Sequence, residues 1–290
     1  FLPIALTSSP FIHRKVLRLM RFKSVMRAGL ERIWVQLVVP LVSDPLNRQR
    51  IKLLLYAWGY FPLIFAKEFG VEARLSMVWR FLKIDWNVLH AHLPSEIVSI
   101  CVAMGGRREM KGEIMIEAGC WKGGSSAKFS ILCKLVGVRL WIFDSFEGVS
   151  VSDAKNEWEG FAGQYASPEN VLWNHLSLYG EPSVCLAIKG WFSETLAKRP
   201  IPHPVRLAYI DCDLAKGTME VMMGIVPSLI PGAVVFSQDF HIGPVRELLS
   251  NAATWIRLGR GTPEINRLGQ RLAKITFPIG EPSVRISERE

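Results

Sequence analysis

A glycine-rich turn with an acid at its start is the first group of residues in this sequence that could do chemistry. It closes the apolar run Glu113–Cys120 and leads into a helical pattern. Glycines permit positive φ angles and a close approach of the backbone, and a helix N-terminus offers free N–H groups. Strand, turn and helix in this order favour a nucleotide-like ligand, although the spacing is not the GxGxxG of dinucleotide folds. The residues expected at the ligand are Glu117, Gly119, Gly123, Gly124 and Ser125.

A second acid follows the next apolar run. Asp144, with Ser145 and Phe146 after it, comes roughly 20 residues beyond the turn, the separation at which an acid meets a ribose. At the end of a second strand its carboxylate can accept hydrogen bonds from both ribose hydroxyls. Two such features at consecutive strand ends favour a nucleotide-like cofactor more strongly than the turn alone.

The elements that must position these residues alternate between strand and helix from residue 96 onward. Short apolar runs predict strands covered on both faces, at Glu113–Cys120, Val138–Phe146, Ser183–Gly190, Val205–Asp213 and Ala233–Phe240. Helical patterns separate them, at Ser125–Val136, Pro168–Leu178, Thr218–Leu229 and Pro244–Leu258. Two final segments, Ala273–Pro278 and Ser283–Ser287, are predicted to pair as a hairpin. This order predicts an α/β fold with a mostly parallel sheet and a C-terminal hairpin.

Residues 1–95 differ in character and are predicted to be a basic, apolar and helical N-terminal extension to a domain over residues 96–290. Residues 1–80 contain 13 Lys and Arg against four Asp and Glu, a net charge of +9 that equals that of the whole chain. The apolar stretches Ile33–Val42 and Leu53–Ala66 are shorter than the ~20 residues of a membrane-spanning helix. Such a region suits an anionic membrane surface or a large protein assembly, and the plainer alternative is a packed helix with a solvated basic face. We expect a chain that begins near Leu82 to keep its cofactor binding.

Composition limits the remaining classes of function. With 49% hydrophobic and 21% charged residues the chain is globular. Its five cysteines have neither zinc nor disulfide spacing, which predicts reduced thiols in a reducing compartment, the cytoplasm or an organelle interior. The sequence contains no GxSxG, HExxH or Walker A motif and no RNA-binding signature, so nucleic acid is not an expected partner. A homo-oligomer is compatible with the sequence.

Five blocks of the sequence resemble the macrocin O-methyltransferase (TylF-type) family of class I S-adenosylmethionine (SAM)-dependent methyltransferases. The blocks are Glu117–Ser126, Phe143–Gly148, Lys189–Leu196, Tyr209–Leu214 and, with departures, Pro231–Phe240. The resemblance covers residues 90–250 and none of residues 1–80. It implies the Rossmann-like class I methyltransferase sheet, which ends in a hairpin. It also implies methylation of a hydroxyl on a small molecule, typically a sugar, with the help of a divalent metal.

The resemblance also implies roles for individual residues. Gly190, Trp191 and Phe192 would close over the adenine, where an aromatic face suits a flat ring. Glu117 would face the ammonium and sulfonium groups of SAM, both of which are cationic. Asp211 belongs to the cofactor site too.

Convergent acids on adjacent strand ends would hold Mg²⁺, a hard cation that prefers oxygen ligands. The implied ligands are Asp211, Asp213, Gln238 and Asp239. The metal would position the acceptor and lower the pKa of its hydroxyl. Asp211 and the neighbouring His241 are the candidate bases, and an ordinary loop histidine is the alternative for His241.

Two departures from the family pattern affect this metal site. Gln238 replaces the first of two consecutive acids, and Ala215 replaces an aromatic residue. A glutamine keeps an oxygen ligand but removes a negative charge, so we expect weak Mg²⁺ binding. The main hypothesis is a SAM-dependent O-methyltransferase. The alternative is a weakened or inactive protein of this fold, an accessory subunit docked through residues 1–80; nucleic-acid methylation is a third and weaker possibility.

Overall fold

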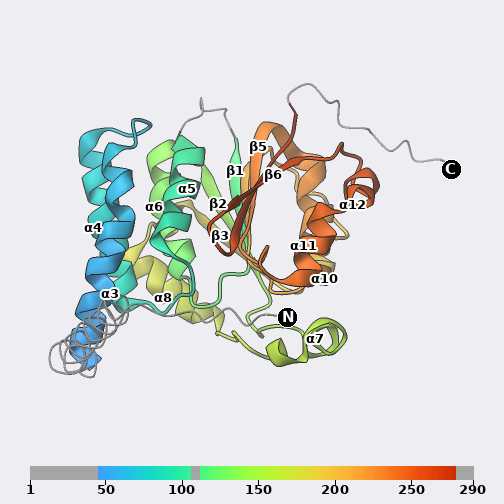
Figure 1. Cartoon of the computed structure of the whole chain (residues 1–290), viewed down its shortest axis with the longest axis horizontal. Coiled ribbons are helices and arrows are strands. Elements are labelled where there is room, and N and C mark those ends of the chain that lie inside the picture. The colour runs from blue at the N-terminus through green and yellow to red at the C-terminus, as the bar shows by residue number, and fades with distance from the viewer. Residues whose placement is uncertain (1–44, 106–111, 279–290) are drawn as a thin grey trace, which may run out of the picture. The chain divides into compact units, whose positions relative to one another are not determined.

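A seven-stranded sheet organises the computed structural model, which describes residues 45–105 and 112–278. The strand order is β3-β2-β1-β4-β5-β7-β6, with five parallel strands followed by an antiparallel pair (Figure 1). The strands are β1 (Ile114–Ala118), β2 (Arg139–Asp144), β3 (Cys185–Lys189), β4 (Val205–Ile210), β5 (Leu229–Ser237), β6 (Glu264–Leu268) and β7 (Leu272–Thr276). The five parallel strands confirm the predicted fold class.

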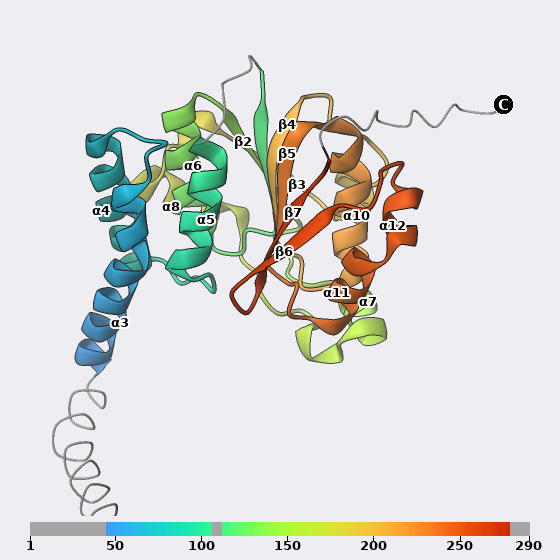
Figure 2. The ribbon, with the colours of Figure 1, turned by 45° about the horizontal axis from the view of Figure 1, so that its top comes forward.

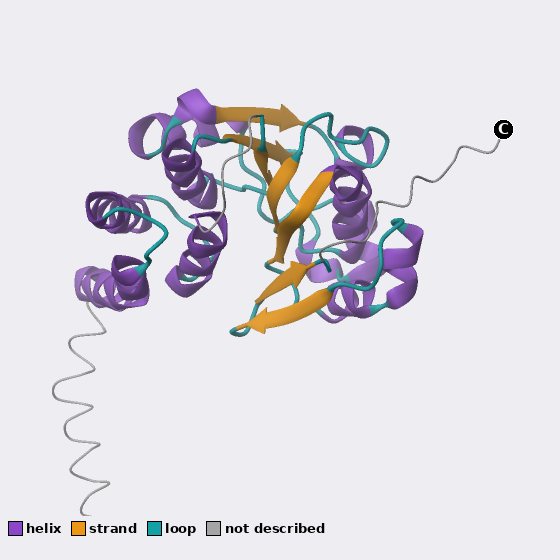
Figure 3. Ribbon diagram, turned by 90° about the horizontal axis from the view of Figure 1, so that it is seen from above, coloured by secondary structure: helices purple, strands orange, loops and turns teal. Residues whose placement is uncertain are grey.

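Helices cover both faces of the sheet, which explains why its central strands are apolar throughout. Every residue of β1 and β4 is buried. Seen from above in Figure 3, one face carries α4 (Val71–Asn87), α5 (Pro94–Gly105), α6 (Gly124–Val136) and α8 (Glu169–Tyr179). The other carries α10 (Ala215–Ile225), α11 (Gly243–Ser250) and α12 (Ala252–Arg257). Each face has its own buried hydrophobic cluster.

The C-terminal hairpin differs from its prediction in one strand (Figure 2). β7 confirms the predicted segment Ala273–Pro278, but its partner is β6, which precedes it. Residues 283–287 lie outside the described residues. β6 is a mostly exposed edge strand with three polar side chains in five residues, so it has no apolar run to reveal it. Gly269, at φ +78°, begins the tight connection to β7.

Two predicted helices have different ends in the structure. The segment Thr218–Leu229 begins earlier, at Ala215, and stops at Ile225, before a 3-10 turn (Val226–Ser228) that contains Pro227. The predicted helix Pro244–Leu258 is two helices, α11 and α12. Asn251 separates them, and its side chain accepts a hydrogen bond from the backbone of Ala253 at 2.9 Å. The predicted strands ending at Asp213 and Phe240 stop three residues earlier, so their acids lie in loops.

The N-terminal region is described from residue 45, so the basic helix expected before it lies outside the described residues. The chain divides into two compact units, Phe1–Leu55 and Tyr56–Glu290. The described elements are α3 (Pro45–Tyr60), a 3-10 helix η2 (Phe61–Phe65), α4 and α5. The predicted domain boundary after residue 95 falls in the first turn of α5 and stays a prediction. Among the described helices, none combines the length and the apolar character needed to cross a membrane.

Several residues between 60 and 81 belong to the core of the second unit, which corrects the expectation that a chain beginning near Leu82 would keep its cofactor binding. Tyr60, Leu63, Met77 and Phe81 are fully buried, and α4 packs on α6. A chain starting at Leu82 would lose these side chains and most of α4. Loss of a large, fully buried side chain costs about 3 kcal/mol, and this truncation would remove several of them. Such a truncation would therefore unfold the domain.

Candidate active site

One cavity of about 790 Å³ brings most of the predicted site residues together. It lies at the carboxyl ends of β1, β2, β4 and β5, where ligands bind in open α/β sheets. Its lining includes the predicted residues Gly119, Gly124, Ser125, Asp144, Ser145, Gly190, Trp191, Phe192, Asp211, Asp213, Gln238, Asp239 and His241. Glu117, Gly123 and Phe146 are buried and are not part of the lining.

The glycine-rich turn is shaped by contacts that exclude side chains. Gly119 has φ +86°, and a Cβ atom on it would lie 1.8 Å from the carbonyl oxygen of Asp211. Gly123 has φ +78° and immediately precedes α6, and an added Cβ would meet the Leu172 side chain at 2.6 Å. The turn therefore presses β1 against the loop after β4, and only glycine permits that approach.

Asp144 ties the end of β2 to this turn. Its Oδ2 accepts hydrogen bonds from the backbone N–H of Cys120 at 2.7 Å and of Trp121 at 3.2 Å. Its Oδ1 accepts one from the N–H of Phe146 at 2.7 Å. A carboxylate has about four acceptor positions, so the side chain retains capacity for a ligand hydroxyl while it holds the turn.

Glu117 is fully buried at the end of β1. Burial raises the pKa of its carboxyl to about 7, against the opposing effect of the nearby Ser125 and Ser126 hydroxyls. A carboxyl with such a pKa gains or loses its charge close to neutral pH. Its charge therefore responds to any cationic group brought into the neighbouring cavity.

Three carboxylates form the densest group of charges in the cavity. One oxygen each from Asp211, Asp213 and Asp239 lies within 4.8 Å of the others. The loop is held together by Asp239, whose Oδ2 accepts the N–H of Cys212 at 2.8 Å and of Asp213 at 2.9 Å. The hydroxyl of Tyr209 donates to Asp211 Oδ2 at 3.3 Å. The backbone thus forces the acids together despite their mutual repulsion.

The pKa values of the three acids reflect this crowding. Burial, then repulsion from Asp239 and Asp213, raises the pKa of Asp211 well above its ordinary value. Burial, then repulsion from Asp239, raises the pKa of Asp213 to about 7. Burial also raises the pKa of Asp239, although hydrogen bonds from the backbone oppose it. A divalent cation would relieve this repulsion, and oxygen donors are the ligands that Mg²⁺ prefers.

Gln238 has a partner that the sequence did not reveal. Its Nε2 donates to Oε2 of Glu96, on α5, at 3.0 Å, while its Oε1 is buried with no hydrogen-bond partner among the described residues. Glu96 also accepts the N–H of Leu93 at 2.6 Å. An acid at position 238 would be repelled by the Glu96 carboxylate, whereas the glutamine amide donates a hydrogen bond to it. Its free oxygen could still serve as a neutral metal ligand.

Two residues that were not predicted, Tyr165 and Arg271, complete the cavity beside the predicted His241. His241 is exposed, and its charge lowers the pKa of Asp239. Tyr165 packs edge-to-face on Trp121, with ring centroids 5.5 Å apart, and burial followed by the charge of Asp213 raises its pKa. Arg271 enters from the β6–β7 hairpin. Tyr165 and Arg271 come from irregular segments whose sequence has no pattern to mark them.

A short helix, α7 (Val151–Glu157), adds a further wall. The Glu157 carboxylate accepts the N–H of Ala215 at 2.6 Å and of Lys216 at 2.8 Å, at the N-terminus of α10. Lys216 in turn pairs with Asp153 of α7, with Nζ and Oδ1 2.6 Å apart. Ala215, the second departure from the family pattern, therefore lies where α7 is fastened to α10.

The architecture around this cavity is that of a class I SAM-dependent methyltransferase. The O-methyltransferase NovP superposes with a TM-score of 0.53 at 17% identity, over 65% of this chain and 83% of that one. The calicheamicin methyltransferase CalS11 superposes with a TM-score of 0.50 at 21% identity, over 82% and 94% of the two chains. At such identities the likeness concerns the fold.

The sequence comparison identifies the family. A sequence model of the macrocin-O-methyltransferase (TylF) family matches residues 97–255, more than half of the chain. The chain belongs to this family, as its motifs indicated. It is also 30% identical over 147 residues to the Streptomyces olivaceus 8-demethyl-8-(2,3-dimethoxy-alpha-L-rhamnosyl)-tetracenomycin-C 4'-O-methyltransferase. That match covers 46% of this chain and 55% of the relative, so the chain spans about half the length of the curated relative.

Proposed function

We propose that this protein is a SAM-dependent O-methyltransferase that acts on a hydroxyl of a small molecule or sugar. The observation that carries the proposal is one cavity that joins the glycine-rich turn and Asp144 to three clustered acids. The names of the relatives support it, because one acts on a rhamnosyl tetracenomycin and another is a calicheamicin methyltransferase.

Cofactor binding would use the part of the cavity formed by the glycine-rich turn, Asp144 and the segment after β3. Asp144 would accept hydrogen bonds from the ribose hydroxyls while it continues to hold the turn. Trp191 and Phe192 would cover the adenine, and Ser125 at the start of α6 would contact the methionine end. The buried carboxyl of Glu117 would lose its proton when the cofactor binds, because the nearby sulfonium and ammonium groups favour the charged form.

Catalysis would use the part of the cavity that contains the three clustered acids. The acceptor hydroxyl would lie in line with the methyl group, so that its oxygen forms the new bond to carbon as the bond from carbon to sulfur breaks. Asp211 would take the hydroxyl proton, and exposed His241 would pass it to solvent.

The metal implied by the family fits the acids on chemical grounds. Asp211, Asp213, Asp239 and the free oxygen of Gln238 would hold Mg²⁺, which supplies Lewis acidity that lowers the pKa of the attacked hydroxyl. Retention of all three acids favours an active enzyme over the inactive alternative. Because Gln238 is neutral, we expect weaker Mg²⁺ binding than a site with a fourth acid would show.

Two measurements test the proposal. Calorimetry with S-adenosylhomocysteine, the product form of the cofactor, reports binding, and methyl transfer from SAM to a panel of hydroxylated glycosides reports activity. Binding together with transfer supports the proposal. Absence of binding at millimolar ligand rejects it, and binding without transfer to any glycoside would favour the accessory-subunit alternative.

We also propose that the N-terminal region docks on an anionic membrane surface. Residues 1–80 carry the net charge of +9, and within the second unit Trp58, Phe65 and Trp79 are 75%, 63% and 72% exposed. Exposed aromatic side chains and a high positive charge are both features that suit an anionic lipid interface. Phe61 stacks on Trp58, with ring centroids 5.6 Å apart, which extends this apolar surface.

Substitution tests this docking better than truncation, because α4 belongs to the core. Full-length protein should sediment with phosphatidylserine vesicles at low salt and be released at high salt. Trp58→Ser with Phe65→Ser should weaken sedimentation, whereas Ile256→Ser, an equally exposed apolar residue on α12, should not. If all three proteins sediment with the vesicles to the same extent, the membrane proposal is wrong, and a protein assembly becomes the better candidate for the docking partner.

A further inference from the structure

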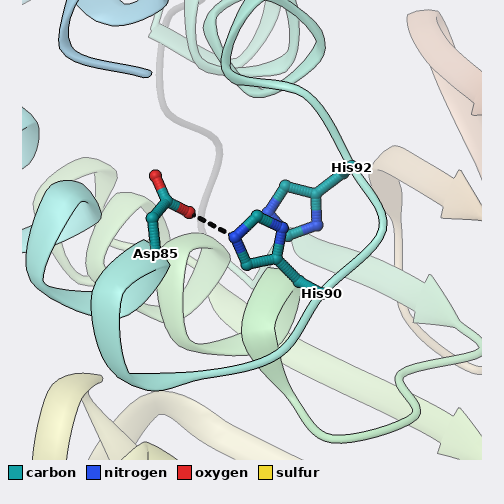
Figure 4. Close-up of side chains that lie close together, drawn as sticks. All are labelled: Asp85, His90 and His92. Carbon is teal, nitrogen blue, oxygen red and sulfur yellow. Dashed lines mark ion pairs between the residues drawn. The ribbon is translucent and has the colours of Figure 1, made fainter. Parts of the chain in front are cut away.

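A second cluster of ligand-type residues lies beside the cavity and has no part in the proposed chemistry. Asp85 comes from α4, and His90 and His92 from the segment that joins α4 to α5 (Figure 4). His90 Nε2 lies 2.7 Å from Asp85 Oδ1, and the two imidazole rings stack with centroids 4.2 Å apart. One ligand atom from each residue lies within 4.8 Å of the others, as in a metal site.

A lysine already occupies the centre of this cluster. Lys128, on α6, is fully buried, and its Nζ donates to Asp85 Oδ1 and lies 2.6 Å from His92 Nε2. An ammonium group only donates hydrogen bonds, so His92 Nε2 must be the acceptor and the imidazole must be neutral. The atoms that a metal ion would share are therefore held by an internal cation.

The cluster fastens one wall of the cavity. His90 and His92 both line the cavity, and a Cβ on Gly124 would lie 2.8 Å from His90 Cβ, so the segment rests on the first turn of α6. The β6–β7 hairpin also holds this segment, because Arg271 Nη1 donates to the carbonyl of Ala91 at 3.0 Å. Lys128 holds it from α6, the helix that begins at the glycine-rich turn.

We propose that Lys128 is a positioning residue: its ammonium, shared by Asp85 and His92, fixes the segment between α4 and α5 against the start of α6 and so sets the cofactor end of the cavity. The inference rests on the proposed function, since it concerns cofactor affinity. Lys128 does not touch the cofactor in this scheme and acts through His92 and through Asp85, which pairs with His90. Removing its charge would leave Asp85 buried without its main cation, which is costly.

The proposal has a pH signature because His92 must stay neutral. Protonation would place an N–H of His92 against the ammonium and break their hydrogen bond, so the wall would loosen at acid pH. Among the described residues, the other charged or titratable groups around the cluster are Tyr56 and Tyr60 of α3, Cys101 and Glu96 of α5, His90 and Arg271. Burial raises the pKa of Cys101 to about 12 and that of Tyr60 above its ordinary value, so neither titrates at acid pH.

The test measures S-adenosylhomocysteine affinity of the full chain from about pH 8 down to about pH 5, the range in which imidazole titrates. Lys128→Met should bind about tenfold more weakly or worse at every pH, while circular dichroism and thermal unfolding show that it is folded. His92→Gln keeps an acceptor for Lys128 but cannot titrate, so it should bind like wild type near pH 8 and lose less affinity at pH 5. His203→Gln, at an exposed site elsewhere, should match wild type throughout.

The possible results separate this inference from the proposed function. A wild type that never binds the ligand overturns both. Wild-type affinity in folded Lys128→Met overturns this inference alone, as does an acid loss in His92→Gln equal to that of wild type. If Lys128→Met does not fold, the pH profiles of His92→Gln and wild type still decide the question.

Discussion

The two clusters beside the cavity have similar geometry and opposite electrostatics. Each places three ligand atoms within 4.8 Å. Burial alone would raise the pKa of Asp85, but His90 and the Lys128 ammonium outweigh it and lower the pKa. The pKa values of Asp211 and Asp213 rise because burial adds to the repulsion among the acids, and burial also raises the pKa of Asp239. A cluster with its own cation is complete, whereas a cluster of acids requires a cation or protons from solution.

The largest effect should come from Asp211→Asn, which separates the roles of the clusters. If the acid cluster is catalytic, this change should lower kcat for methyl transfer by about 100-fold or more, through loss of the base. Affinity for S-adenosylhomocysteine should change far less than in Lys128→Met. If Asp211→Asn loses affinity for S-adenosylhomocysteine and keeps its kcat, the two clusters do not have the separate roles assigned to them.

Asp144→Ala should weaken cofactor binding by roughly 1–3 kcal/mol, because two ribose hydroxyls would lose their partner in a closed pocket. Calorimetry gives the dissociation constant. The structure adds a second effect, since the N–H groups of Cys120, Trp121 and Phe146 would also lose their acceptor. Asp144→Asn keeps one acceptor oxygen and should fall between wild type and Asp144→Ala. An unchanged affinity in both variants would remove Asp144 from the cofactor site.

Mg²⁺ should stabilise the acid cluster more at high pH than at low pH. Asp213 has a folded-state pKa of about 7, above its ordinary value of 3.8, so the charge becomes costly to the folded state as the pH rises between these values. Without metal, stability should fall across this window, and added Mg²⁺ should restore a few °C of melting temperature near pH 8 and little near pH 5. In Asp213→Asn both the pH dependence and the Mg²⁺ effect should shrink. An equal Mg²⁺ effect at both pH values would contradict the assignment.

Gln238→Asp should have the smallest effect, a rise of a few-fold in Mg²⁺ affinity. The added charge favours the metal, but it would face the Glu96 carboxylate that now accepts the Gln238 amide hydrogen bond. Combining it with Glu96→Gln removes that repulsion and should tighten Mg²⁺ binding further, as titration calorimetry can measure. Tight Mg²⁺ binding by the wild type would show that three acids suffice and that the glutamine does not weaken the site.

Local sequence was sufficient to place three candidate site residues at one edge of the sheet. Gly119, Asp144 and Asp211 could each be placed at a strand end, because an apolar run followed by glycine or acid marks where a buried strand leaves the sheet. Parallel strands end at one edge, so residues far apart in sequence had to meet there. Two facts came only from the structure. Asp144 accepts hydrogen bonds from the backbone of the glycine-rich turn, and Glu117 is buried and does not line the cavity.

Tertiary packing alone decided the rest. Edge strand β6 could not be predicted, because an exposed strand needs no apolar alternation. In sequence Lys128 resembles any lysine on a helix, and Asp85 and His92 are 43 and 36 residues away. Only the packing of α4 on α6 buries the ammonium and makes a carboxylate and an imidazole its partners, since the energy of a buried charge depends on neighbours that no local pattern specifies.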